Sequence, residues 1–290
     1  MNKAECVILN GILGDQLGAP YEFKTHEEIK EIYSSGKKLQ GQRYTDDSLM
    51  TMALVLFFND YVENYPLEKV MDYYAKTYQP NRVYGPNTEA TILKYMQFNA
   101  VTESSSQYSG SIMRACPAVF VKDTDTNYLA YVVSYPTHIH HVTFEVTKIY
   151  IDFMRFLLAV PHDDLYDRII DYISKVKINN LNPLKKQIKY ILDNLNSDEI
   201  KVAKELMGTD NSICYTVFSC SIWCLINHLD DPKGIIHRVI LYGGDTDTTA
   251  KITGEMIAAI YGNDAIDMKL MKGLEGIDPA IRQVISLIGD

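Results

Sequence analysis

The sequence predicts an all-α fold, a compact single domain over residues 1–290 built as an orthogonal bundle of many helices. Three observations support this prediction. Apolar residues recur at three- and four-residue spacing along most of the chain, which is the period of a helix with one buried face. Alternating strand patterns bounded by hairpin turns are scarce. No Pro-, Gly- or Ser-rich linker divides the chain, and no internal repeat is evident.

The periodic segments predict helices in a defined order, and most begin at a residue that favours a helix start, such as Pro66, Pro183 or Asp198. The expected helices cover 48–62, 66–78, 87–98, 144–160, 163–176, 182–195, 197–207, 212–229 and 233–240. A further apolar helix is expected after Asp245. Segment 112–121 fits either a strand or a helix, because Pro117 weakens both interpretations. Residues 100–111 read as the clearest long loop.

Composition excludes some classes of function. The net charge of −9 argues against a protein that holds nucleic acid through its phosphates, although an anionic small ligand can still bind to backbone N–H groups. No apolar run reaches the roughly 18 residues that span a bilayer. The apolar N-terminus is interrupted at Asn10, Gly11, Gly14 and Asp15, unlike a signal peptide.

The five cysteines are expected to be buried free thiols in a reducing compartment, which favours the cytoplasm. Cys220 and Cys224 lie one helical turn apart in a predicted helix. A zinc site at this pair would need two more ligands, and no spacing in the sequence supplies them.

Two acidic helix starts carry the strongest functional signal. The stretch YTDDS contains Asp46 and Asp47, and GGDTDTT, about 200 residues later, contains Asp245 and Asp247. One such oxygen would suffice to cap a helix, and capping is the ordinary role of each start taken alone. If both starts converge, four carboxylates would repel one another. Two hard divalent cations, bound by carboxylate and threonine oxygens, would relieve that repulsion.

Three weaker patterns accompany the acidic starts. GILGDQLGAPYEF spaces glycines so that a helix can pack closely, and it also supplies Glu22. The Ser109–Ser111 loop resembles a phosphate cradle, although such loops are common. Arg114 after it suits a structural ion pair or a ligand contact equally. Among the histidines of PTHIHH, contact with a ligand phosphate or capping of a helix is favoured over zinc binding.

Taken together, these motifs resemble the ADP-ribosylglycohydrolase family. They occur in the family's order, as GILGDQLGAPYEF, YTDDS, YGPNT, SGSIMRACP, PTHIHH and GGDTDTTAKITGEMIAAIYG. The resemblance covers residues 6 to about 262. Two departures stand out, because the family usually has Asn where this chain has Ser109, and Thr where it has Ser48. The first leaves open whether substrate preference differs.

The resemblance implies an all-α enzyme with two Mg²⁺ or Mn²⁺ ions. It implies that six residues bind these ions: Thr45, Asp46, Asp47, Asp245, Asp247 and Thr248. It implies that seven residues contact the substrate: Gly85, Ser109, Gly110, Ser111, Ile112, Met113 and His138. Catalytic roles would fall to Asp245, as the base that takes a proton from water, and to Glu22, which would ligate metal or gate substrate entry.

The implied reaction is metal-assisted hydrolysis of the N- or O-glycosidic bond between ADP-ribose and an acceptor. The acceptor would be a protein arginine or serine, or another ADP-ribosylated protein, nucleic acid or small molecule, and ADP-ribose would be released. We expect a monomer. Three alternatives remain: a non-catalytic ADP-ribose-binding or crystallin-like structural protein, another metal-dependent nucleotide hydrolase, and a helical scaffold.

Overall fold

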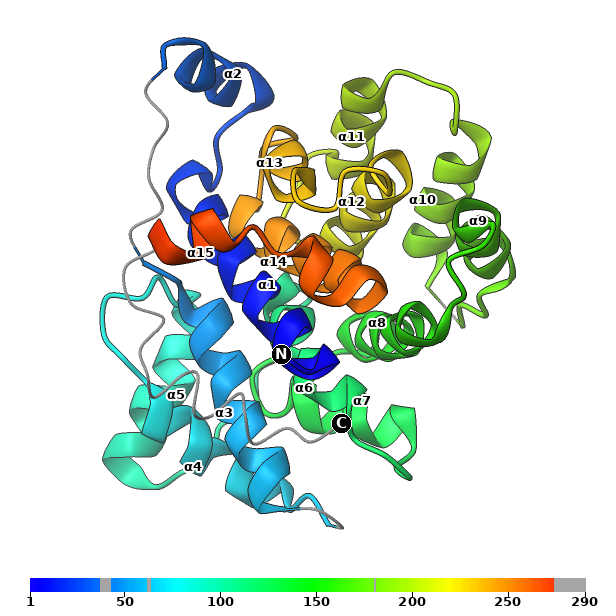
Figure 1. Ribbon diagram of the computed structural model, residues 1–290. Coiled ribbons are helices and arrows are strands. Elements are labelled where there is room, and N and C mark those ends of the chain that lie inside the picture. Colours follow the sequence, from blue (N-terminus) through cyan, green and yellow to red (C-terminus); the bar gives the residue numbers. More distant parts are fainter. Residues whose placement is uncertain (37–42, 62–63, 180, 274–290) are drawn as a thin grey trace.

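The computed structural model describes residues 1–36, 43–61, 64–179 and 181–273, and these residues are helical without a β-strand (Figure 1). The α-helices are α1 (Lys3–Gly18), α2 (His26–Ser34), α3 (Asp46–Asp60), α4 (Leu67–Thr77), α5 (Pro86–Phe98), α6 (Cys116–Val119), α7 (Thr126–Ser134), α8 (His141–Ala159), α9 (Leu165–Lys175), α10 (Asn182–Asp193), α11 (Glu199–Met207), α12 (Cys214–Asn227), α13 (Ile235–Ile240), α14 (Thr246–Tyr261) and α15 (Met268–Gly273). Three short 3₁₀ helices, η1 (Ala19–Tyr21), η2 (Ser109–Arg114) and η3 (Gly262–Ala265), complete the set. The all-α prediction is confirmed. The end of the expected domain, 274–290, lies outside the described residues.

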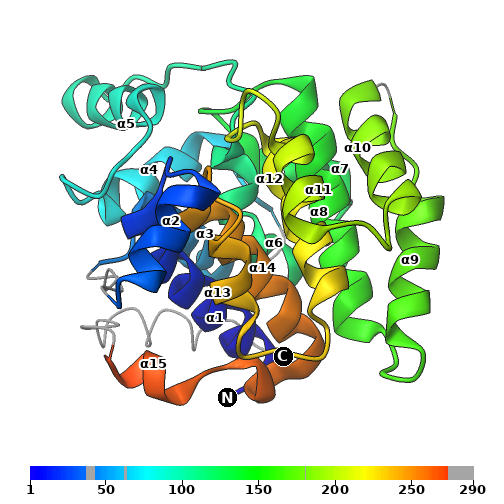
Figure 2. The same cartoon turned by 90° about the horizontal axis from the view of Figure 1, so that it is seen from above.

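Helices α1 and α14, from opposite ends of the sequence, lie side by side through the middle of the molecule (Figures 1 and 2). A Cβ atom on Gly14 would stand 2.3 Å from the carbonyl oxygen of Ala250, and one on Gly18 would stand 2.4 Å from that of Thr246. The two backbones are therefore in direct contact. The glycines of the first motif serve the close helix packing that the sequence suggested.

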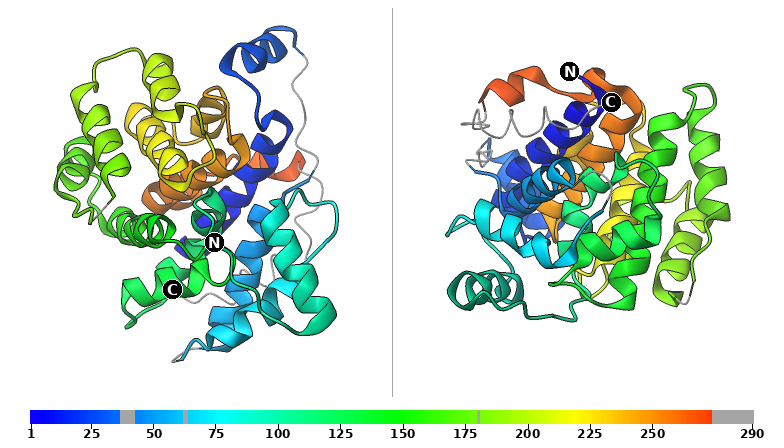
Figure 3. Two further views of the ribbon diagram at one scale, coloured as in Figure 1. Left: turned by 180° about the vertical axis from the view of Figure 1, so that it is seen from behind. Right: turned by 90° about the horizontal axis from the view of Figure 1, so that it is seen from below.

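The remaining helices surround this pair. Helices α3, α4 and α5 lie on one side, and α9 and α10 form the opposite edge (Figure 3). Segment 112–121 is helical, with η2 followed by α6, and Pro117 is accommodated in the first turn of α6. No helix among the described residues is long and apolar enough to cross a membrane. All five cysteines are buried and free, as expected.

A buried ion pair lies within α14 beneath the acidic helix start. Lys251 Nζ is 2.7 Å from Glu255 Oε1, and both side chains are fully buried. Tyr150 on α8 donates a 2.6 Å hydrogen bond to the other carboxylate oxygen. Because an unpaired buried charge is very costly, these partners explain how an apolar helix can carry Glu255.

Candidate active site

The first acidic start is capped by Thr45, which leaves both aspartates available. The Thr45 hydroxyl oxygen accepts a hydrogen bond from the backbone N–H of Asp47. Asp15, fully buried at the end of α1, in turn accepts bonds from the N–H and hydroxyl groups of Thr45 and Ser48. The backbone N–H groups in the first turn of α3, which have no partner within the helix, are thus hydrogen-bonded without using the carboxylates of Asp46 and Asp47. Ser48, which keeps the hydroxyl of the family's threonine, uses it to fix Asp15.

The second start has a different construction, because its N-cap residue does not cap. Asp245 precedes α14, but its side chain makes no capping hydrogen bond. Gly243 and Gly244 have φ of 86° and 76°, a left-handed conformation that glycine adopts without strain. Gly244 exchanges backbone hydrogen bonds with Phe23 and Lys24, at 2.7 and 3.0 Å. This pairing brings the segment that carries Glu22 against the start of α14.

Both starts open into one cleft of about 580 Å³. Five carboxylate side chains line it: Glu22, Asp46, Asp47, Asp245 and Asp247. The described lining contains no lysine or arginine, although it includes Thr248 and His138. The convergence expected from the sequence is present.

Two oxygens in the cleft lack partners, and this tests whether cations fit. Asp47 Oδ2 and Asp247 Oδ1 are buried, and neither has a hydrogen-bond partner among the described residues. An unpaired buried carboxylate oxygen is costly unless an ion or water satisfies it. The donors are all oxygens, which Mg²⁺, Mn²⁺ and Ca²⁺ prefer over zinc's usual nitrogen and sulfur. The cleft therefore fits hard divalent cations.

The carboxylates raise one another's pKa. Burial, followed by the negative charges of Asp245 and Asp15, raises the pKa of Glu22 from 4.5 to about 7. Burial and neighbouring carboxylates also hold the pKa values of Asp46, Asp47 and Asp247 well above their usual range. Without cations, the folded protein therefore favours protonated side chains here.

This electrostatic arrangement predicts an unusual pH dependence of stability. A carboxyl group whose pKa is raised by folding binds its proton more tightly in the folded state. The stability that such a group contributes is therefore complete at low pH. For Glu22, this contribution to the free energy of unfolding is lost as the pH rises from its ordinary pKa of 4.5 to its folded-state pKa of about 7. In chelator, the melting temperature should fall across this range, and Glu22→Gln should flatten part of the fall. Saturating Mg²⁺ should largely remove it, whereas a melting temperature that rises with pH in chelator would contradict this account.

The η2 segment forms another wall of the cleft. Ser109, Gly110 and Met113 line the cleft, and the Ser109 hydroxyl donates a 2.9 Å hydrogen bond to Asp245 Oδ2. Ser111 and Ile112 do not line it. Ser111 accepts a hydrogen bond from Thr147, and Ile112 is fully buried in the core. Direct side-chain contacts with a substrate are therefore left to Ser109 and Met113 within this loop.

His138 packs against the same loop, since a Cβ on Gly110 would come within 2.5 Å of its Nε2. Its Nδ1 is 2.8 Å from the Thr137 hydroxyl, which accepts a bond from the buried Arg114. This hydroxyl can then donate to Nδ1, which leaves a proton on Nε2. Burial and the Arg114 charge hold the pKa of His138 well below 6.5, so the ring is neutral. His140 caps α8 through the N–H of Val142, as the sequence suggested for one of the histidines.

The sequence suggested that Arg114 forms a structural ion pair or contacts a ligand. Among the described residues it forms no ion pair, and it does not line the cleft. It is fully buried, donates to the Val133 carbonyl as well as to Thr137, and lies 5.0 Å from the centre of the Tyr74 ring.

Two further predicted site residues differ in their position. Thr45 does not line the cleft, so its predicted role as a metal ligand stays a prediction. Gly85 does line the cleft, at the start of α5.

Comparisons with known proteins identify the family of this chain. A sequence model of the ADP-ribosylglycohydrolase family matches residues 1–290. The chain belongs to the ADP-ribosylglycohydrolase family. A curated protein of Acanthamoeba polyphaga mimivirus, provisionally named an ADP-ribosyl glycohydrolase, is 22% identical over 289 residues, covering 90% of this chain and 87% of the relative. A solved structure titled "ADP-ribosylglycohydrolase-related protein complex" shares the fold, with a TM-score of 0.66 and 18% identity over 99% of this chain and 95% of that one.

Three exposed residues at the rim of the cleft were not among the site residues predicted from the sequence. Phe23, Val83 and Tyr108 line it and are 65%, 63% and 51% exposed. Phe23 and Val83 also have positive φ, of 60° and 62°, which is rare for a bulky or β-branched residue. Sequence reasoning missed all three, because a single exposed apolar residue carries no periodic signal. Val83 directly before YGPNT was the nearest available hint.

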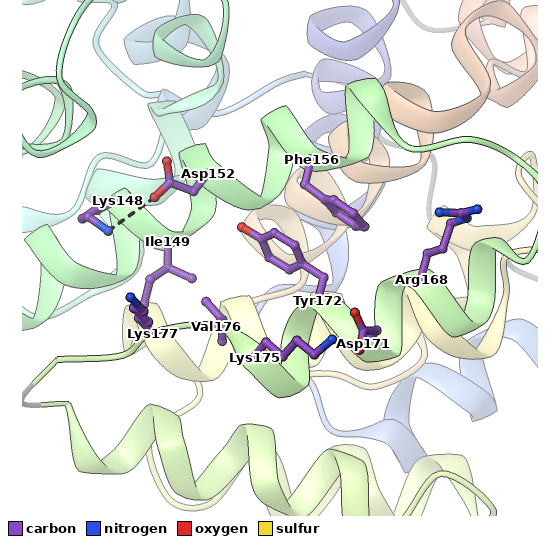
Figure 4. Close-up of a pocket in the computed structure, with 10 residues that line it drawn as sticks. All are labelled: Lys148, Ile149, Asp152, Phe156, Arg168, Asp171, Tyr172, Lys175, Val176 and Lys177. Atoms are coloured by element: carbon purple, nitrogen blue, oxygen red, sulfur yellow. Dashed lines mark hydrogen bonds and ion pairs between the residues drawn. The ribbon is translucent and has the colours of Figure 1, made fainter.

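A second hollow, of about 460 Å³, lies between α8 and α9 (Figure 4). It contains none of the residues predicted for the ADP-ribosylglycohydrolase site. Lys148 pairs with Asp152 at 3.3 Å, and Lys175 pairs with Asp171 at 2.5 Å, each pair within one helix. Such surface pairs are ordinary and contribute little to stability. The acidic cleft is therefore the candidate active site.

Proposed function

We propose that this protein is a metal-dependent hydrolase that cleaves the N- or O-glycosidic bond between ADP-ribose and an acceptor. One observation carries the proposal: Asp47 and Asp247, about 200 residues apart in the sequence, each have in one cleft a buried carboxylate oxygen that no described residue hydrogen-bonds. Membership of the ADP-ribosylglycohydrolase family supplies the class of substrate. The mimivirus relative's name agrees, although identity is low.

The proposed cation ligands are Asp46, Asp47, Asp245, Asp247 and Thr248, which line the cleft, together with Thr45 beside them in the chain. Two Mg²⁺ or Mn²⁺ ions would orient the ribose hydroxyls and lower the pKa of water. Of the three threonines in the second start, Thr246 and Thr249 use their hydroxyls on backbone carbonyls. Thr248 is the one that lines the cleft, which favours it as a ligand.

Asp245 is the proposed general base. The hydrogen bond from Ser109 fixes one of its carboxylate oxygens, so the side chain keeps one orientation while the other oxygen can accept a proton. Glu22 is the proposed second catalytic group, because it lines the cleft close enough to Asp245 for the two charges to interact, and it would ligate a cation or gate substrate entry. Because Ser109 holds Asp245 in place, serine has a defined role at the position where the family usually has asparagine.

The substrate's diphosphate would be held without positively charged side chains, since none lines the described cleft. Gly110 lines the cleft, and the absence of a side chain there leaves room for the His138 ring against η2. The neutral His138 can donate through Nε2. Gly85 and Met113 would border the bound ligand. We further infer a single domain over 1–290, consistent with the span of the family match, a monomer, and a cytoplasmic location consistent with five free cysteines.

The test is single-turnover release of ADP-ribose from arginine- and serine-linked ADP-ribosylated proteins with Mg²⁺, Mn²⁺ or chelator. We expect release with either cation and a loss of at least about 100-fold in chelator, because metal catalysis contributes several kcal/mol. The preferred linkage would identify the acceptor.

Three other outcomes point elsewhere. Tight ADP-ribose binding without release from any substrate would favour a binding or crystallin-like protein on the same fold. Metal-dependent release of inorganic phosphate instead of ADP-ribose would favour a nucleotide hydrolase. A protein that neither binds nor releases ADP-ribose would refute the assignment and leave the scaffold alternative.

A further inference from the structure

A second cluster of metal-binding side chains lies where α11, α12 and α13 meet, outside the acidic cleft. Glu199 is the first residue of α11, Cys224 lies within α12, and His228 follows the last residue of that helix. One ligand atom from each of these three lies within 4.8 Å of the others. Because Cys224 and His228 are four residues apart, they share one face of the helix end.

Tyr242, which follows α13, completes the cluster. Its hydroxyl donates a 2.6 Å hydrogen bond to Glu199 Oε1, and the same oxygen is 2.9 Å from His228 Nε2. Cys224 and Tyr242 are buried, whereas the His228 and Glu199 side chains are 15% and 30% exposed. A cation could therefore enter from solvent on the histidine and glutamate side and reach the thiol behind them.

We propose that Glu199, Cys224 and His228 form a binding site for Zn²⁺ or a similar borderline divalent cation, with Tyr242 or water as fourth ligand. One sulfur, one imidazole nitrogen and one carboxylate oxygen form a set typical of zinc. The sequence alone argued against zinc at Cys224, because no ligand spacing accompanied it. Tertiary packing supplies the missing ligands from residues on two other segments.

Binding would exchange one set of bonds for another. The metal takes the Cys224 thiolate, and the thiol proton is released to solvent. The Nε2 proton that His228 donates to Glu199 must also leave through solvent, so that Nε2 can coordinate while the bound imidazole carries its single proton on Nδ1. The metal then replaces the hydrogen bond between His228 and Glu199. Arg238 is the nearby positive charge that opposes a cation, and it is partly offset by Asp231, 3.9 Å away.

The ligand sets distinguish this cluster from the active-site cleft. The five carboxylates of the cleft offer the oxygen ligands that Mg²⁺ prefers, whereas Mg²⁺ binds poorly to the thiolate and imidazole of the cluster. Excess Mg²⁺ would therefore occupy the cleft and leave the cluster open. Tyr242 immediately precedes Gly243 and Gly244, so a metal here would tie α11 and α12 to the turn that carries Asp245.

Co²⁺ added to the full chain in excess Mg²⁺ tests the proposal, because a cobalt–thiolate bond gives a near-ultraviolet charge-transfer band. We expect one equivalent to produce this band and Zn²⁺ to displace it. The chain's one tryptophan, Trp223, donates its ring N–H to the Glu199 carbonyl oxygen, so its fluorescence should be quenched by Co²⁺ in step with the band. Neither readout depends on enzymatic activity.

The variants assign the band to its ligands. Cys224→Ser should abolish it, and His228→Gln should weaken Co²⁺ binding at least about tenfold, the scale of losing one well-placed ligand interaction. Cys220→Ser is the matched control, since Cys220 is buried one turn earlier on the same helix, and it should leave the band unchanged. Far-ultraviolet circular dichroism confirms that each variant is folded.

Two results would overturn the proposal: wild-type protein without a thiolate band at saturating Co²⁺, or a band that survives Cys224→Ser. Both can be obtained whether or not the protein hydrolyses ADP-ribosyl bonds, so this site and the proposed function fail independently.

Discussion

Asp247→Asn is expected to lower metal-dependent turnover by about 100- to 1,000-fold while making the metal-free protein more stable. Asparagine keeps the shape of the side chain but removes a negative charge from a cleft that five carboxylates line. A metal ion's contribution to catalysis amounts to several kcal/mol, and each 1.36 kcal/mol corresponds to a factor of ten in rate. In chelator, the same change removes the cost of folding with this carboxyl group either charged or protonated, since burial, followed by the charges of Asp245, Asp47 and Glu22, holds the pKa of Asp247 well above its usual range.

The measurement pairs kcat with Mg²⁺ against the melting temperature in chelator. A gain of about 1 kcal/mol would raise the melting temperature of a chain this long by about 2 °C. Asp163→Asn is the charge-matched control, because Asp163 is exposed between α8 and α9. It should change neither quantity. A variant that loses activity and also loses stability in chelator would mean that Asp247 serves the fold and not a cation.

Gly14→Ala is expected to lower the free energy of unfolding by about 3 kcal/mol, the upper part of the range for overpacking a core. The new methyl group would meet the carbonyl oxygen of Ala250 at 2.3 Å, and backbone atoms within a helix cannot move aside singly. Alanine's better helix propensity returns only about 0.5–1 kcal/mol of that loss.

Urea unfolding followed by circular dichroism measures this effect. Gly85→Ala is the control for stability, because a Cβ there meets no atom within 4 Å and the backbone is not left-handed. The two should differ by at least about 2 kcal/mol. Activity should fall with Gly14→Ala as well, since separating α1 from α14 moves Asp15 relative to Asp245. Equal stability of the two variants would contradict direct backbone contact.

Local chemistry made much of the fold and site predictable. Apolar spacing predicted the helices from α3 to α5 and from α8 to α13 to within a few residues, and it predicted an apolar helix after Asp245. Helices such as α4, α9 and α10 bury one face, whereas α3, α12 and α14 are buried on nearly all sides. Thr45 and His140 follow the ordinary rules for helix starts. The two carboxylate clusters, far apart in the sequence, suggested two halves of one site, but only tertiary packing could join them. If they met, their repulsion would need a common counter-charge.

Features that depend on tertiary packing could not be predicted in the same way. Nothing near Asp15 in the sequence indicates that it fixes the start of α3, 30 residues away. The exposed Phe23 and Val83 have backbone conformations imposed by their surroundings. The cluster of Glu199, Cys224 and His228 exists because two helix ends meet, and no sequence spacing records that meeting.

The contact between α1 and α14 also determines when this protein can first become functional during its synthesis. Helix α1 is synthesised first, and its packing partner α14 is synthesised more than 200 residues later, so the contact between Gly14 and Ala250 cannot form before then. Contacts of such long sequence separation slow folding, since a loop of more than 200 residues must close before the contact forms. Helix α1 therefore leaves the ribosome with its apolar surface uncovered, and only neighbouring helices can cover it until the residues of α14 have been made.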